Sequence, residues 1–390
     1  MRRLIALAPI SVLMMIAACG GGGGSSDLGG GGGGGSPSGS NVAPVTVDAG
    51  PNGNSVNTPF VSVTVCSPSS PGTCETVDHI EVDTGSFGLR IIASVLPSTF
   101  VLPAQEDASN DAIYECAVFG DGYSWGSVHM ANVQIAGETA SNIPVQIIGD
   151  AASGTPPSSC SSMGSVNENS VGTFGANGII GVGPFVGDGQ IYYSCPGGVC
   201  GEISPPAQVA NPVASFAADN NGVILELPAV PSDGSATVTG SLVFGIGTES
   251  NNGLSTATIY TLDANTGTLT ITYNSTAYDM SFLDSGSNAI YLVDNSIPQC
   301  SGFYCPASTL ALMATITGAN GTSNTVGFNI ANAEALFSAD PSGTAFNNLG
   351  APNTFGTFID FGLPFFYGRN IYTAIDGAAT PGGTGPYVAF

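Results

Sequence analysis

The sequence predicts an all-β fold on the strength of three observations: abundant turn residues, short β-prone runs and one repeated motif. The 390 residues include 56 glycines and 26 prolines, which interrupt helices and favour turns. From about Thr58 onward, runs rich in β-branched and aromatic residues alternate with clusters of turn residues. Strands of this length and spacing are typical of sandwiches and barrels. The repeated motif divides the β region into two related halves.

Residues 1–18 have the layout of an export signal. Two arginines precede an apolar run over residues 4–16, which is too short to span a bilayer, and two alanines and Cys19 follow. Cleavage after Ala18, as in an ordinary signal peptide, is one interpretation. The segment also resembles a bacterial lipobox, in which Cys19 is lipidated and becomes the first residue, and we favour this second interpretation. Gly20 after the cysteine then implies an exported lipoprotein of the outer membrane.

Residues 19–41 form a tether rich in Gly and Ser. Such compositions behave as flexible chains, and about 22 residues have a root-mean-square reach of about 25 Å. We therefore expect a folded domain over residues 42–390 that contacts the membrane only through the N-terminal lipid. The sequence leaves open whether it faces the periplasm or the cell surface.

The eight cysteines after Cys19 are an even number, which suits disulfides in an oxidising compartment. Metal binding is the alternative, but His79 and His129 are isolated, and no cysteine cluster has a histidine at ligand spacing. We therefore expect no metal and no cofactor. Short spacings predict three disulfides and leave two cysteines for the fourth: Cys66–Cys74, Cys195–Cys200, Cys300–Cys305 and Cys116–Cys160.

The β-prone runs make up most of the domain, and one short helix is predicted over Asn332–Ser338. In chain order the predicted strands are Phe60–Val65, His79–Val82, Leu89–Ile92, Val128–Ile135, Val145–Ile148, Val223–Leu227, Leu242–Ile246, Thr258–Leu262, Leu269–Tyr273 and Ala289–Leu292.

One motif occurs twice in the chain. Asp-Thr-Gly-Ser at residues 83–86 and Asp-Ser-Gly-Ser at residues 284–287 each follow a β-prone run and precede an apolar one. Two carboxylates held close together do not both ionise readily, so one keeps a proton. One carboxyl can then activate a water molecule while the other protonates a carbonyl oxygen. A single Asp-Thr-Gly is common in turns, but two copies in matching contexts indicate a catalytic pair, Asp83 and Asp284.

These motifs make the sequence similar to the pepsin-like aspartic peptidases. Residues 177–184 and 357–376 resemble the two segments that cross beneath the catalytic loops of that family, and residues 119–135 resemble its flap hairpin. The resemblance covers about residues 57–390. It implies a bilobal pepsin-like fold, with an N-lobe over about residues 57–225, a C-lobe over about residues 226–390 and a cleft between them.

The resemblance also implies roles for individual residues. Asp83 and Asp284 would be catalytic, Thr84 and Ser285 would brace the two loops against each other, and Ser86 and Ser287 would bond the outer carboxylate oxygens. The remaining expected site residues are Gly85 and Gly286 in the two loops, and Phe119, Gly120, Arg90 and Trp125 at the flap and cleft.

Two positions depart from the family pattern, and in the family they contact each other. Phe119 stands in place of the flap tyrosine, and Arg90 stands in place of the tryptophan that bonds to it. Arg90 could stack on Phe119 or stabilise an ionised Asp83. Alternatively, it points outward and only solvates a strand.

The charge composition excludes nucleic acid as a partner. After Cys19 the chain keeps only Arg90 and Arg369 as basic residues, against 28 acidic residues. A surface this acidic repels phosphate groups, and no basic stripe reverses the local field.

Two functions remain open on the sequence alone. The first is a monomeric aspartic endopeptidase that takes a polypeptide substrate in the cleft, since both Asp-(Thr/Ser)-Gly-Ser motifs are intact. The second is a binding or scaffold protein of the cell envelope that kept the fold but lost efficient cleavage, as the flap change suggests. We favour the enzyme, although fold resemblance alone is an indirect guide to function.

Overall fold

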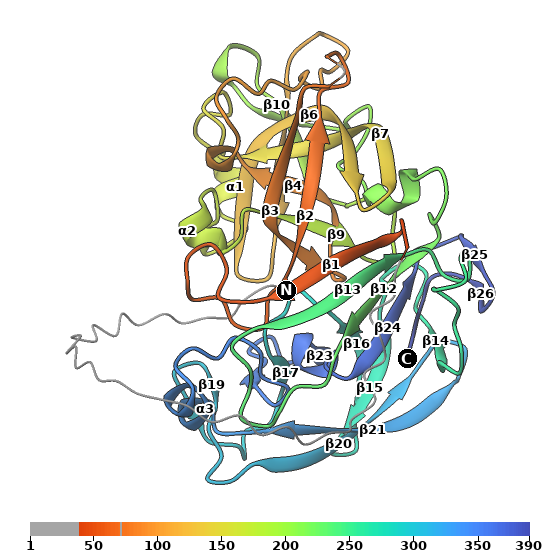
Figure 1. The fold of residues 1–390 in the computed structure, drawn as a ribbon. Coiled ribbons are helices and arrows are strands. Elements are labelled where there is room, and N and C mark those ends of the chain that lie inside the picture. The colour runs from red at the N-terminus through yellow and green to blue at the C-terminus, as the bar shows by residue number, and fades with distance from the viewer. Residues whose placement is uncertain (1–38, 71) are drawn as a thin grey trace, which may run out of the picture.

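The computed structural model describes residues 39–70 and 72–390 as two β lobes joined by a shared sheet (Figure 1). The predicted signal segment, Cys19 and most of the tether lie outside the described residues. The N-lobe holds β2 (Pro59–Cys66), β3 (Cys74–Asp83), β4 (Phe87–Ile92), β5 (Ile113–Val118), β6 (Gly122–Ile135), β7 (Glu138–Ile148), β8 (Val166–Asn167), β9 (Gly178–Val182), β10 (Ile191–Ser194) and β11 (Gly201–Ile203).

The shared sheet crosses the middle of the molecule (Figure 1). The first strand, β1, pairs with β2 of the N-lobe on one side and with β13 on the other, so the hydrogen-bonded ladder continues from one lobe into the next. The strands that extend it are β1 (Val42–Val47), β13 (Val238–Phe244), β12 (Gly222–Leu227), β24 (Arg369–Ala374), β27 (Tyr387–Ala389) and β14 (Ile259–Thr261).

The C-lobe is built on a second sheet, in the order β21-β20-β15-β16-β23-β17-β22. Its strands are β15 (Leu269–Tyr273), β16 (Thr276–Leu283), β17 (Ile290–Leu292), β20 (Leu310–Thr317), β21 (Ser323–Ile330), β22 (Gly350–Pro352) and β23 (Asp360–Phe361). Two small hairpins complete the strands: β18 (Gln299–Cys300) with β19 (Phe303–Tyr304), and β25 (Ala379–Thr380) with β26 (Gly383–Thr384).

The helices are short. They are α1 (Ser158–Ser161), α2 (Val171–Phe174) and α3 (Ala333–Ala339), with 3-10 turns at Ala93–Val95, Pro196–Gly198, Pro212–Ser215 and Leu363–Phe365. The predicted helix is confirmed as α3, where the Asn332 side chain accepts a hydrogen bond from the Ala335 N–H at 2.9 Å and so caps the N-terminus. None of the helices in residues 39–70 and 72–390 is long and apolar enough to cross a membrane.

Alternating side chains form the core. In β2, Val61, Val63 and Val65 are buried while Ser62 between them is exposed, and in β15 Leu269, Ile271 and Tyr273 are buried in the same way. Burial of each such side chain contributes about 1.5–3 kcal/mol, so this period-two pattern holds each strand in one register.

Every predicted strand overlaps a strand of the structure, but several boundaries are wrong and several strands were not predicted: β3, β6 and β7 begin five to seven residues before the predicted starts His79, Val128 and Val145. The predicted Leu242–Ile246 strand ends at Phe244, because Gly245 has φ of 81° and turns the chain out of the ladder. The sequence did not predict β1, β5 or the β20–β21 hairpin. In β20 and β21 most side chains are partly or fully exposed, so the apolar alternation that marks a strand is weak there.

All four predicted disulfides are present: Cys66–Cys74, Cys116–Cys160, Cys195–Cys200 and Cys300–Cys305. Cys66–Cys74 closes the β2–β3 hairpin. Cys116–Cys160 ties the middle of β5 to α1 and lies in a small aromatic core of the N-lobe.

Candidate functional site

A strand crosses beneath each Asp-(Thr/Ser)-Gly-Ser loop and holds it in place. In the N-lobe, β9 runs parallel to β3 and antiparallel to β4, with Gly181 opposite Asp83. In the C-lobe, β23 lies between β16 and β17 in the same manner. A Cβ atom on Gly181 would lie 2.2 Å from the Phe87 nitrogen, and one on Gly362 would lie 2.2 Å from the Ala289 oxygen. The glycines of the crossing segments therefore allow the strands to pass this closely.

Thr84 and Ser285 link the two loops across the lobe interface. The Thr84 N–H donates to the Ser285 Oγ at 3.1 Å, and the Ser285 N–H donates to the Thr84 Oγ1 at 3.0 Å. Each hydroxyl also donates into the opposite lobe, Thr84 to the Leu283 carbonyl at 3.4 Å and Ser285 to the Val82 carbonyl at 2.8 Å. All four groups are buried, so this reciprocal set fixes the position of one loop relative to the other.

Each aspartate carboxyl packs against the glycine of the opposite loop. A Cβ atom on Gly85 would lie 2.7 Å from the Asp284 Cγ, and one on Gly286 would lie 2.7 Å from the Asp83 Cγ. Each carboxyl also accepts a hydrogen bond from the glycine N–H of its own loop, at 2.7 Å for Asp83 and 2.8 Å for Asp284. The two carboxyl groups are thus brought face to face at the junction of the lobes.

The electrostatics of the pair favour one retained proton. Asp83 is 3% exposed and Asp284 is 1% exposed. The pKa of Asp284 lies well above its ordinary value, chiefly because of burial, then because of the negative charge of Asp83 and, to a smaller degree, that of Asp360. Asp284 therefore keeps its proton to a higher pH than an exposed aspartate does.

The serines that follow the two glycines behave differently. The Ser287 hydroxyl donates to the Asp284 Oδ2 at 3.0 Å, in the manner that the resemblance implies. The Ser86 hydroxyl is buried and has no hydrogen-bond partner among the described residues, so the expected bond to Asp83 is not formed. The Ser86 carbonyl accepts from Gly183 at 3.0 Å and the Ser287 carbonyl accepts from Leu363 at 2.7 Å. Since the backbones are held alike, the difference lies in the side-chain orientation.

The flap hairpin is formed by β5 and β6, with Phe119, Gly120 and Asp121 in its turn. The Phe119 N–H donates to the Gly122 carbonyl at 2.8 Å and closes the turn. The Phe119 ring packs edge-on against Phe174 of α2, with 5.9 Å between the ring centres. Phe119 therefore joins an apolar cluster of the N-lobe.

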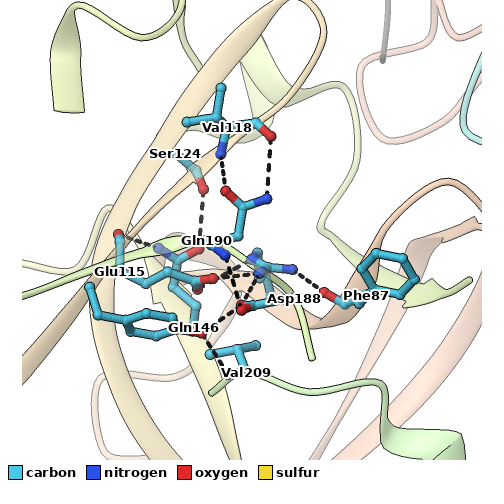
Figure 2. A network of polar contacts seen from close by, with 10 residues as sticks. Phe87, Glu115, Val118, Ser124, Gln146, Asp188, Gln190 and Val209 are labelled. Atoms are coloured by element: carbon cyan, nitrogen blue, oxygen red, sulfur yellow. Dashed lines mark hydrogen bonds and ion pairs between the residues drawn. The ribbon is translucent and has the colours of Figure 1, made fainter. Parts of the chain in front are cut away.

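Arg90 occupies none of the three positions considered from the sequence. Arg90 is fully buried, so it does not solvate a strand, and it neither stacks on Phe119 nor pairs with Asp83. Instead, its guanidinium group forms two hydrogen bonds to the Glu115 carboxylate of β5 and an ion pair of 2.9 Å with Asp188 (Figure 2). Its Nη1 also donates to the Phe87 carbonyl at 2.6 Å. Burial alone would lower the pKa of Arg90, but the two carboxylates raise it above its ordinary value.

The network around Arg90 links several segments of the N-lobe: β4, β5, β7, β10 and the chain after β9 (Figure 2). Tyr192 of β10 donates to Asp188 at 2.5 Å, and Gln146 of β7 donates to the Glu115 carbonyl at 2.7 Å. Asp188 follows β9, which crosses beneath the first aspartate loop. The strand that leaves that loop is thereby tied to the base of the flap.

Trp125 does not line the cleft. It is fully buried in the small core with Tyr193 and the Cys116–Cys160 disulfide, and its indole N–H donates to the Ser153 carbonyl at 2.9 Å. Trp125 lies on β6, where alternate side chains face the aromatic core. The sequence-based prediction that it lies at the flap and cleft was therefore wrong.

A cavity of about 250 Å³ opens between the lobes beside the two loops. The N-lobe contributes Gly85, Phe87 and Phe185 to its walls, and the C-lobe contributes the turn at residues 266–268 and Phe282. The walls are mostly apolar, and four threonines, Thr84, Thr266, Thr268 and Thr373, are among the residues that line them. The cavity is therefore suited to an apolar side chain held next to the carboxyl pair.

Sequence reasoning missed several buried acidic residues, among them Glu115, Asp188 and Asp360. Glu115 and Asp360 each had a visible signal. Glu115 interrupts the β-prone run Ile113–Val118, and Asp360 stands two residues before Gly362 of its crossing segment, where the N-lobe segment has the apolar Ile179. A single acid within an apolar strand has to be paired or to change its pKa when the strand is buried.

Two β lobes joined by one sheet, each with an aspartate loop held by a crossing strand, confirm the predicted all-β, two-lobed pepsin-like fold. A comparison with curated proteins found no match. Among solved structures, the crystal structure of an aspartic proteinase from Irpex lacteus is similar, with 16% sequence identity and a TM-score of 0.49, over 89% of this chain and 96% of that chain. A family model matches residues 37–390, and the chain therefore belongs to the family described as "Protein of unknown function (DUF3443)".

Proposed function

We propose that this protein is an exported, membrane-anchored aspartic endopeptidase, in which Asp83 and Asp284 activate water to hydrolyse peptide bonds. The observation that carries the proposal is the meeting of two buried carboxyl groups, each packed against the glycine of the opposite loop. The reciprocal Thr84–Ser285 bonds hold this arrangement across the lobe interface.

The chemistry follows from one proton shared by two carboxyls. The ionised carboxyl takes a proton from a water molecule as its oxygen attacks the peptide carbonyl carbon, while the protonated carboxyl gives its proton to the carbonyl oxygen. The carboxyl that took the proton from water then gives it to the leaving nitrogen as the C–N bond breaks, while the other carboxyl takes back a proton from a hydroxyl of the tetrahedral intermediate, so the pair ends with the single proton with which it began. The bonds from Gly286 and Ser287 hold the Asp284 carboxyl in one orientation during these transfers.

The proposed substrate is an extended polypeptide that lies between the lobes. An apolar side chain of this polypeptide would enter the cavity next to Phe87 and Phe282. Attachment of the enzyme to a bacterial outer membrane through lipidated Cys19 belongs to the same proposal and rests on the layout of residues 1–19. Intact mass of the membrane-extracted protein tests it, because a free Cys19 thiol or another first residue contradicts lipidation.

A second candidate is a binding or scaffold protein with little catalytic activity. Two observations favour it: the Ser86 hydroxyl does not support Asp83, and Phe119 lacks the hydroxyl of the flap tyrosine.

Hydrolysis of a denatured protein mixture distinguishes the two candidates. The full chain, purified in mild detergent, is incubated with the mixture from acid to neutral pH, and new peptide termini are mapped by mass spectrometry. Asp83→Asn and Asp284→Asn should each reduce cleavage by several orders of magnitude without unfolding the protein, whereas Asp233→Asn, at an exposed position, should have no effect. Equal cleavage by wild type and Asp83→Asn, or none by any folded form, favours the scaffold.

A further inference from the structure

Asp360 is a third acidic residue next to the two aspartate loops. It lies on β23, the strand that crosses beneath the C-lobe loop, and it pairs with Phe282 of β16 and Tyr291 of β17. The next residue, Phe361, accepts a hydrogen bond from the Asp284 N–H at 3.1 Å. Asp360 therefore directly precedes the residue whose backbone is hydrogen-bonded to Asp284.

The Asp360 side chain is buried without the partners that a buried carboxylate requires. It is 1% exposed, and its carboxyl oxygens form no hydrogen bond of normal geometry with the described residues, although the Ser287 hydroxyl approaches closely enough to lower its pKa. An isolated ionised carboxylate in such surroundings is costly, so the group responds by keeping its proton. Burial raises the pKa of Asp360 to about 7, and the negative charge of Asp83 also raises it.

The charge of Asp360 acts on both members of the pair. The negative charge of Asp360 raises the pKa of Asp284, while the Ser287 hydroxyl, which donates to Asp284, also lies close enough to Asp360 to lower its pKa. Three carboxyls and one serine hydroxyl thus form one connected group.

The other elements packed against Asp360 bring no positive charge to it within the described residues. From β16 its cross-strand neighbour is the apolar Phe282, and from β17 it is Tyr291, whose hydroxyl donates to the Asn288 side chain at 2.7 Å. Arg90 is bound to Glu115 and Asp188 in the N-lobe, and the Arg369 guanidinium lies over the Phe365 ring at 4.1 Å.

We propose that Asp360 is a positioning residue of the site, whose charge sets the upper pH limit at which Asp83 and Asp284 keep their shared proton. When Asp360 ionises, its negative charge opposes ionisation of the pair, and the pair retains its proton to a higher pH. A neutral side chain at this position removes that effect. The catalytic part of the inference rests on the proposed peptidase function, whereas the coupling between the carboxyls does not.

The test compares wild type with Asp360→Asn, which keeps the shape of the side chain but removes its charge, and with Asp360→Leu, which serves if the amide destabilises the fold. Asp233→Asn is the control for loss of an exposed carboxyl. The full chain is used throughout. The pH dependence of kcat/KM is measured with a peptide substrate, and the carboxyl carbons of Asp are titrated by ¹³C NMR after selective labelling.

Two results are expected for the Asp360 variants. The alkaline limb of the pH profile moves to lower pH by about one unit, the size of shift that a neighbouring charge produces. A carboxyl that titrates near pH 7 disappears from the NMR spectrum, and the Asp284 signal titrates at lower pH than in wild type. Asp233→Asn changes neither measurement.

The outcomes separate this inference from the proposed function. An active enzyme with an unchanged alkaline limb in folded Asp360→Asn or Asp360→Leu overturns the role of Asp360 and leaves the peptidase in place. If the wild type is inactive but the Asp284 pKa still differs between wild type and the Asp360 variants, the peptidase function is contradicted and the coupling between the carboxyl groups is supported. An Asp284 titration that does not move overturns the coupling itself.

Discussion

The hydroxyl groups of Thr84 and Ser285 accept hydrogen bonds from each other's backbone N–H groups across the interface between the lobes, at 3.0 Å and 3.1 Å respectively. Because these bonds join the two aspartate loops directly, the distance between the carboxyl groups depends on them. The sheet that joins the lobes sets the approximate position of one lobe relative to the other. The two Thr84–Ser285 hydrogen bonds then set the exact position of one aspartate loop relative to the other.

Replacement of Thr84 by Val should destabilise the protein and reduce hydrolysis. The valine keeps the shape but leaves the buried Ser285 N–H without its acceptor, which costs about 1–3 kcal/mol. Urea unfolding measures the stability, and kcat measures the alignment of the pair. Thr84→Ser keeps a hydroxyl and is the control. A Thr84→Val protein as stable and active as Thr84→Ser contradicts the bracing role.

Gly286→Ala should separate the two carboxyls. Its Cβ would lie 2.7 Å from the Asp83 Cγ, so the loops have to move apart, and displacement of reacting groups by about 1 Å can reduce a rate about 100-fold. Gly201→Ala is the matched control, because a Cβ at Gly201 meets nothing within 4 Å. The ratio of kcat values between the two variants tests the prediction, and equal rates contradict it.

Arg90→Met should strongly destabilise the N-lobe. Glu115 and Asp188 would remain buried without their cation, and loss of one partner of a buried ion pair costs about 3–5 kcal/mol. Urea unfolding at pH 7 measures this loss. Adding Glu115→Leu should recover part of the stability, since one unpaired charge is removed. If the double variant instead loses the sum of the stability losses of Arg90→Met and Glu115→Leu measured singly, Arg90 and Glu115 do not act as a pair.

Stability should depend on pH through Asp360. Its pKa is about 7 in the folded protein and about 3.8 when unfolded, so the folded state holds a proton that the unfolded state releases between these pH values. The stabilisation by protonated Asp360 is complete below pH 4 and is lost as pH rises through 7. Asp360→Asn lacks this loss and should be more stable than wild type by about 4 kcal/mol at pH 8, but not at pH 4.

Urea unfolding of both proteins at these two pH values checks this prediction, with Asp233→Asn as the control for an exposed carboxyl. A constant difference between wild type and Asp360→Asn from pH 4 to pH 8 contradicts it. This measurement requires no enzymatic activity, so it is independent of the proposed function.

Features determined by neighbouring residues were predictable from the sequence. The β15 strand was predicted at its full length because its alternation of buried and partly exposed side chains is regular. The helix after Asn332 has a local cap. Cys195–Cys200 and Cys300–Cys305 are each separated by five residues, so the chain itself holds the partners close. Both Asp-(Thr/Ser)-Gly-Ser loops were also visible, because each is a continuous stretch of chain.

The tertiary structure alone decided which charges meet inside the protein. Arg90 pairs with Asp188, 98 residues away in the chain, and this distant partner is the reason that it neither stacks on Phe119 nor reaches Asp83. Asp360 became part of the site because β23 crosses beside β16. Burial and charge pairing depend on segments that only folding brings together, and these two factors set the pKa and orientation of each acid.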